Sequence, residues 1–86
     1  MQDSCLSCYR KHVSKANVFE NEANMGYPLH KYLAIGELSC AEDEVVKEFP
    51  ILAEQTREIR LKYEFENTPI PTLELIELSL QLEEKE

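Results

Sequence analysis

The chain has 86 residues, enough for one domain with a modest core. Its 9 basic and 17 acidic residues give a net charge of −8, which argues against binding duplex nucleic acid or anionic membranes, because both require a basic surface. With 43% hydrophobic residues the composition is that of a folded domain, and its apolar runs are too short to span a bilayer.

A first helix is predicted over about residues 5–24, with Ser4 as its N-cap. The turn that follows is predicted at residues 25–28. Gly26 can adopt the left-handed conformation that closes a helix, and Pro28 suits the first turn of the next one.

The second helix is predicted over about residues 28–48. Four of its residues lie along one line: Leu29, Leu33, Gly36 and Cys40. A glycine inside a helix costs about 1 kcal/mol relative to alanine. We therefore expect another backbone to approach Gly36 closely.

Pro50 is expected to begin a third helix that reaches about Glu64, and residues 67–72 form a break. The last segment, residues 73–83, fits a helix in part and a strand in part. We predict a helix, because Leu, Glu and Gln favour helices and no β-branched run is present. The predicted fold is all-α: one domain over residues 1–86, a small bundle of three to four helices that begins with an antiparallel helical hairpin.

The predicted last helix carries large aliphatic residues on more than one face. They are Leu73, Leu75, Ile76, Leu78, Leu80 and Leu82. A terminal helix of this kind needs more than one neighbour, and a short chain offers few. The pattern therefore favours a homodimer.

Charge is distributed unevenly along the chain. Residues 1–36 carry four bases and three acids, a net charge of +1, whereas residues 37–86 carry five bases and fourteen acids, a net charge of −9. The acidic part is either a solvated surface or a docking face for a basic protein partner.

Two cysteines and a histidine are spaced as metal ligands on the first predicted helix. Cys5, Cys8 and His12 stand at i, i+3 and i+7, so their side chains fall within a narrow arc. Thiolate and imidazole are the ligands that Zn²⁺ favours, in a tetrahedral set of four. The spacing indicates a structural zinc site that needs one further ligand.

The geometry of the hairpin indicates which residue is the fourth ligand. With the turn centred near residue 26, residue i faces residue 52 − i, so Cys40 lies opposite His12 while His30 faces Glu22. The predicted zinc ligands are therefore Cys5, Cys8, His12 and Cys40. Glu37 and Glu44, one turn either side of Cys40, are the reserves.

Two other interpretations of the cysteines stay open. Buried cysteines behave as small hydrophobic residues, so all three could belong to the core. Alternatively, Cys5 and Cys8 form a redox pair, with the thiolate of a cysteine at the helix N-terminus stabilised by the helix dipole. The odd count of three argues against a secreted disulfide framework and predicts a cytoplasmic protein.

The run from Cys5 to Val13, followed by Gly26-Tyr27-Pro28-Leu29-His30, resembles a group of small microbial and phage-borne proteins of uncharacterised function. These proteins share a C-x-x-C-x-x-x-H helix and a G-Y-P-x-H segment, and the resemblance covers about residues 5–50. It implies that Cys5, Cys8 and His12 act together and that His30 has a role. Because relatives often carry His at position 37 and no cysteine at position 40, it also favours Glu37 over Cys40 as the fourth ligand.

The leading functional hypothesis is a non-enzymatic helical protein, clasped by zinc, that serves as an interaction or assembly module. Its first alternative is a thiol-redox or small catalytic protein that uses Cys5 and Cys8. Its second is a metal-free acidic dimer that docks a basic partner.

Overall fold

Four α-helices make up most of the computed structural model, which describes residues 4–85. They are α1 (Cys5–Asn24), α2 (His30–Val45), α3 (Pro50–Glu66) and α4 (Thr72–Glu84), and no strand occurs in this range. The predicted all-α bundle is confirmed, and residues 73–83 are helical as expected. Within the described residues, no helix has both the length and the apolar composition needed to cross a bilayer.

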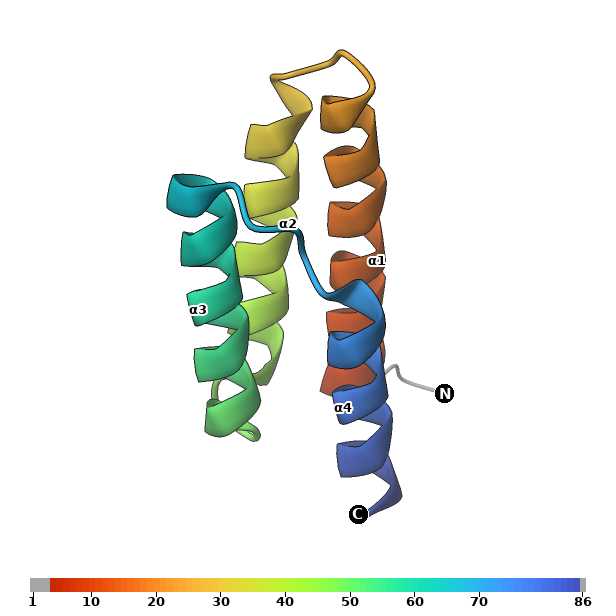
Figure 1. The fold of residues 1–86 in the computed structure, drawn as a ribbon. Helices are drawn as coiled ribbons and strands as arrows, with labels where there is room; N and C mark the ends of the chain where they lie inside the picture. Colours follow the sequence, from red (N-terminus) through yellow and green to blue (C-terminus); the bar gives the residue numbers. More distant parts are fainter. Residues whose placement is uncertain (1–3, 86) are drawn as a thin grey trace.

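The helices form two layers (Figure 1). α1 and α2 make the antiparallel hairpin that the sequence predicts. α3 packs on α2 and α4 packs on α1, whereas α3 and α4 hardly touch one another. The second layer is therefore open along its middle.

Local signals set most helix ends. Ser4 caps α1 by accepting a hydrogen bond from the Ser7 amide at 3.1 Å, as predicted. Gly26 takes the left-handed region with φ +119°, and Asn67 ends α3 in the same region with φ 56°. Both positions stop a helix because few other residues adopt that conformation without strain.

The ends of α2 differ from the prediction. It begins at His30, because residues 27–32 first form tight turns in which the His30 amide donates to the Tyr27 carbonyl at 2.9 Å. It ends at Val45 and not at residue 48. Phe49 precedes a proline and adopts φ −132°, ψ 66°, a conformation outside the helical region.

The core lies between the two layers and is built from one stripe of each helix. Its buried apolar residues are Leu6, Tyr9, Val13, Ala16, Ala34, Leu38, Ala41, Val45, Leu52, Ala53, Tyr63, Ile70 and Leu75. Four of them are alanines, so the helices approach closely.

A buried polar chain links α1 to α3. The Tyr9 hydroxyl lies 2.8 Å from the Thr56 hydroxyl, which donates to the Leu52 carbonyl at 2.8 Å. Since the Thr56 proton is used in that second bond, the Tyr9 hydroxyl is the donor to Thr56. Both side chains are fully buried, so each bond replaces a contact with water that folding removes.

A second buried polar contact holds the segment between α3 and α4. The Glu20 carboxylate, on α1, accepts a hydrogen bond from the Ile70 amide at 2.9 Å. Arg10, also on α1, then donates to Ser79 at 3.3 Å and to Glu83 at 3.1 Å, both on α4. These bonds attach the segment before α4, and then the second half of α4 itself, to α1.

We expect Thr56→Val to destabilise the protein more than Tyr9→Phe. The valine leaves the buried Tyr9 hydroxyl without an acceptor, at a cost of about 1–3 kcal/mol, whereas Tyr9→Phe leaves Thr56 bonded to Leu52 and costs about 1 kcal/mol. Urea denaturation of the two variants measures the difference. A larger loss in Tyr9→Phe would contradict the proposed direction of the hydrogen bonds.

Stability is expected to fall in alkaline solution. Burial raises the pKa of Tyr9 above its usual 10.0, against a smaller lowering by the bond to Thr56. Burial and the charge of Glu20 raise the pKa of Tyr63. Because the folded state retains protons that the unfolded state releases, this stabilisation is complete below pH about 10 and is lost as the pH rises through the folded pKa values. Denaturation at increasing pH should show the decline, with a shallower slope in Tyr9→Phe.

Candidate functional site

The three candidate ligands of the first helix do lie on α1, where the spacing predicts them. Cys5 and Cys8 are partly buried, and Cys5 packs against the core. The His12 side chain is 26% exposed. These side chains are therefore neither wholly within the core nor free on the surface.

Across the hairpin, His12 contacts Glu37, one of the two reserve residues. The His12 Nδ1 lies 2.7 Å from the Glu37 Oε1, a contact that joins the two helices of the hairpin. Cys40 is exposed, so the expectation that Cys40 faces His12 is wrong. The rule that pairs i with 52 − i gives only the position of a residue along the helix axis, and it does not give the side of the helix on which the residue lies. At 100° per residue, Cys40 is turned about 130° from the middle of the buried stripe of α2, whereas Glu37 borders that stripe.

Of the predicted zinc set, the structure thus brings together His12 and the reserve residue Glu37. The other reserve, Glu44, is exposed near the end of α2. Among residues 4–85, no three imidazole, thiol or carboxylate side chains are grouped as metal ligands. Zinc binding, and the redox alternative for Cys5 and Cys8, stay predictions.

The second histidine lies at the tip of the hairpin, opposite Glu22 as the register predicts. Its Nδ1 is 2.5 Å from the Glu22 Oε2, and its ring stacks on Tyr27 with centroids 5.5 Å apart. The rings of His30 and Phe19 are nearly perpendicular, with centroids 5.8 Å apart. His30 therefore ties the start of α2 to the last turns of α1.

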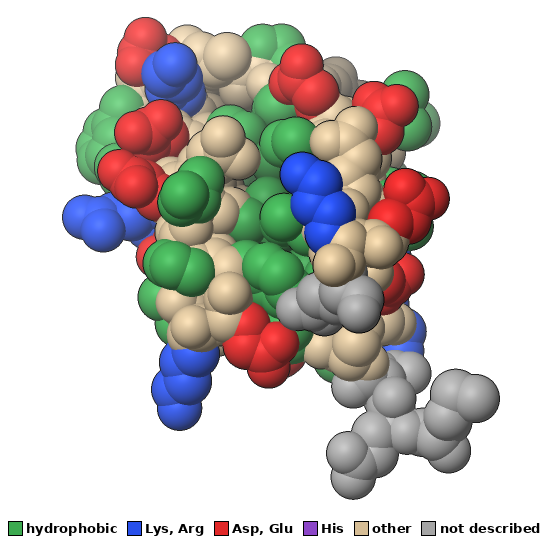
Figure 2. Space-filling model, turned by 90° about the horizontal axis from the view of Figure 1, so that it is seen from below, with side chains coloured by type: hydrophobic (Ala, Val, Ile, Leu, Met, Phe, Trp, Pro, Cys, Tyr) green, Lys and Arg blue, Asp and Glu red, His purple; other side chains and the backbone are tan. Residues whose placement is uncertain are grey.

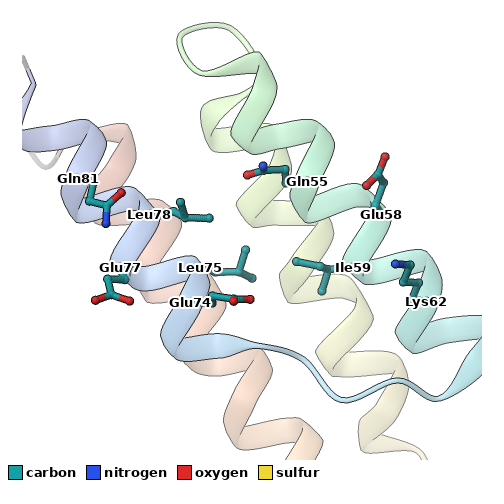
Figure 3. Close-up of a pocket in the computed structure, with 9 residues that line it drawn as sticks. All are labelled: Gln55, Glu58, Ile59, Lys62, Glu74, Leu75, Glu77, Leu78 and Gln81. Atoms are coloured by element: carbon teal, nitrogen blue, oxygen red, sulfur yellow. The ribbon is translucent and has the colours of Figure 1, made fainter.

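A groove between α3 and α4 is the main feature that the sequence did not predict (Figure 3). It consists of two adjoining hollows of about 390 Å³ each, both lined in part by Gln55, Leu78 and Gln81. One hollow extends to Lys62 on α3, and the other extends to Ile51 at the beginning of that helix. At 1.5 Å per residue the groove is about 16 Å long, or three helical turns.

The groove combines apolar, amide and charged side chains, and the amides Gln55 and Gln81 line both of its hollows. Its apolar lining residues are Phe49, Pro50, Ile51, Leu52, Ile59, Leu75, Leu78 and Leu82. Its charged lining residues are Glu48, Glu58, Glu74, Glu77, Lys62 and Lys85, four acids and two bases. Seen from below, hydrophobic side chains run through the centre of the molecule, with charged ones around them (Figure 2).

The aliphatic surplus of α4 was the sequence signal for this groove. Leu75 is buried in the core, while Leu78 and Leu82 pack against the core and also line the groove. The same surplus predicted a homodimer through α4. Internal packing covers Leu75 fully and Leu78 and Leu82 in part, whereas Leu73 is 83% and Leu80 43% exposed. The homodimer stays a prediction.

No protein-family model matches the chain, and comparisons with curated proteins and with solved structures give no match either. The resemblance to the small microbial and phage-borne group therefore stays a prediction.

If zinc clasps the hairpin, the purified protein should contain about one zinc ion per chain, and a chelator should lower its melting temperature. Cys8→Ser and Glu37→Gln should lose the metal. Cys40→Ser is the matched control and should retain it, because that side chain is exposed. Less than about 0.2 zinc per chain, with a melting temperature that is unchanged in chelator, would exclude the clasp.

Proposed function

We propose that the protein is a non-enzymatic interaction module and that the groove between α3 and α4 binds an amphipathic helix of a partner protein, with basic residues flanking its apolar stripe. The observation that carries this proposal is a groove along two helices that hardly touch one another, lined by apolar side chains from both with the amides Gln55 and Gln81 between them. Such grooves bind helices through apolar anchors spaced three and four residues apart.

The groove is held open by contacts elsewhere. α4 is fixed to α1 by the buried Leu75 and by Arg10, which donates to Ser79 and Glu83. α3 is fixed to α2 by the core and by the contact of Arg60 with Glu42 at 3.5 Å. Because α1 holds α4 and α2 holds α3, neither α3 nor α4 has to pack on the other, and the groove between them stays open.

Its charge favours a basic occupant. Three of the four charged residues in the hollow that reaches Lys62 are acidic: Glu58, Glu74 and Glu77. A protein of net charge −8 also attracts a basic partner from a distance. The α4 of a second copy would instead bring Glu74 and Glu77 against these same acids, so the groove is not suited to binding it.

The test uses a fluorescein-labelled peptide of about 14 residues, with leucines at helical spacing and lysines at both ends. We expect it to bind the full-length protein, and we expect Leu78→Ala to raise the dissociation constant about tenfold. Leu33→Ala, on the outer side of α2, is the matched control and should leave binding unchanged. Fluorescence anisotropy measures both.

The charged residues that line the groove provide a second test of peptide binding. Glu77→Lys should weaken binding by about two- to fivefold, as expected for an exposed ion pair, and should reduce its salt dependence. Glu44→Lys changes the net charge equally outside the groove and should have a smaller effect. Equal binding by Leu78→Ala and Leu33→Ala, or by a peptide of the same composition with its stripe scrambled, would show that the groove is not the binding site.

A further inference from the structure

An apolar stripe runs along the outer side of α2 and remains uncovered. We call Leu29, Tyr32, Leu33, Gly36 and Cys40 the outer stripe; all are exposed, Leu29 by 74%, Tyr32 by 70% and Leu33 by 48%. At 100° per residue, the outer stripe lies opposite the buried stripe formed by Ala34, Leu38, Ala41 and Val45. Its spacing of four, three and four residues, from position 29 to 33, 36 and 40, is that of a seam between two packed helices.

Gly36 marks the middle of the outer stripe. The sequence predicts that another backbone approaches this glycine, yet a Cβ built there meets nothing within 4 Å. Its backbone is not in the left-handed region either, since the positive φ values of the described residues belong to Gly26 and Asn67. Glycine is a poor helix former, and among residues 4–85 no contact or turn uses its missing side chain. What the missing side chain does provide is room for a helix from outside.

We infer that the outer stripe is the interface with a second copy of this chain, with the two α2 helices crossing antiparallel at Gly36. This interface is separate from the groove and does not rest on it. A two-fold axis at Gly36 places residue i beside residue 72 − i of the other copy, so Tyr32 meets Cys40 of the partner subunit.

The charges of α2 select the antiparallel arrangement. The helix has no acid in its first turn and no base in its last, so its dipole is not complemented at either end. Its acids gather instead near its C-terminal end, where Asp43 and Glu44 are exposed. In an antiparallel pair, Asp43 of the partner subunit lies beside Leu29, next to the positive end of the α2 dipole. A parallel pair would place these acids against their own copies.

Four of the five residues of the outer stripe lie in the less acidic part of the chain. Residues 1–36 carry a net charge of +1, against −9 for residues 37–86. Since two chains of net charge −8 repel one another overall, added salt should strengthen the dimer. Binding of a basic helix in the groove should respond to salt in the opposite direction.

Gly36→Ala tests the inference with a variant that is expected to fold normally. Because the site has open space and a helical backbone, alanine should raise the melting temperature of the dilute protein by a few degrees. At the crossing point the same methyl group should separate the helices and raise the dimer dissociation constant about tenfold. Sedimentation over a range of protein concentrations measures the second effect. Opposite changes in the two quantities distinguish a lost interface from a damaged fold.

Leu33→Glu should abolish the dimer. Leu73→Glu places the same charge on an exposed leucine of α4 and is the matched control. The inference is overturned if the wild-type protein stays monomeric up to about 1 mM, or if Leu73→Glu dissociates the dimer and Leu33→Glu does not.

Crosslinking tests the orientation. In the antiparallel pair the two Cys40 residues are about 12 Å apart along the helix axes, beyond the reach of a disulfide, whereas Tyr32→Cys lies beside Cys40 of the partner subunit. Mild oxidation should therefore link chains of Tyr32→Cys through positions 32 and 40, as mapped by mass spectrometry. A Cys40–Cys40 link in the wild-type dimer would show that the helices are parallel and would overturn the antiparallel assignment.

Discussion

The hydrogen bond from the Ile70 amide to the Glu20 carboxylate determines where the last helix lies. Ile70 and Glu20 are both buried, so neither group has water as a replacement partner. The bond holds the connecting segment against α1, and α4 therefore continues along α1 and does not close against α3. The open second layer, and with it the groove, follows from this placement.

Two apolar surfaces of the described residues, the groove and the outer stripe, differ in their chemistry. The groove is concave and carries more acids than bases, which suits a basic helix from another protein. The outer stripe of α2 is a helix face with a glycine at its centre, which suits close packing of a second helix. Because the two surfaces lie on different helices, a dimer formed through α2 would leave both of its grooves accessible.

Much of the local structure was predictable because it depends on single residues. Ser4 supplies an N-cap oxygen, Gly26 adopts a left-handed conformation, and Pro50 lacks the amide that a helix interior requires. The ends of α2 were less predictable, because its N-terminus depends on backbone turns that have no side-chain cap. Its C-terminus depends on the conformation that Pro50 imposes on Phe49.

From the sequence alone came an all-α bundle of three to four helices, the hairpin, the position of His30 opposite Glu22 and the arc that contains Cys5, Cys8 and His12. Each follows from spacing within one helix or across one short turn. Tertiary structure decided that His12 meets Glu37, that Cys40 and Gly36 face outward, and that α3 and α4 stay apart. These outcomes depend on how each helix is rotated about its own axis and on contacts between segments that are distant in the sequence, such as Glu20 with Ile70. The spacing of residues along the chain does not determine these two features directly.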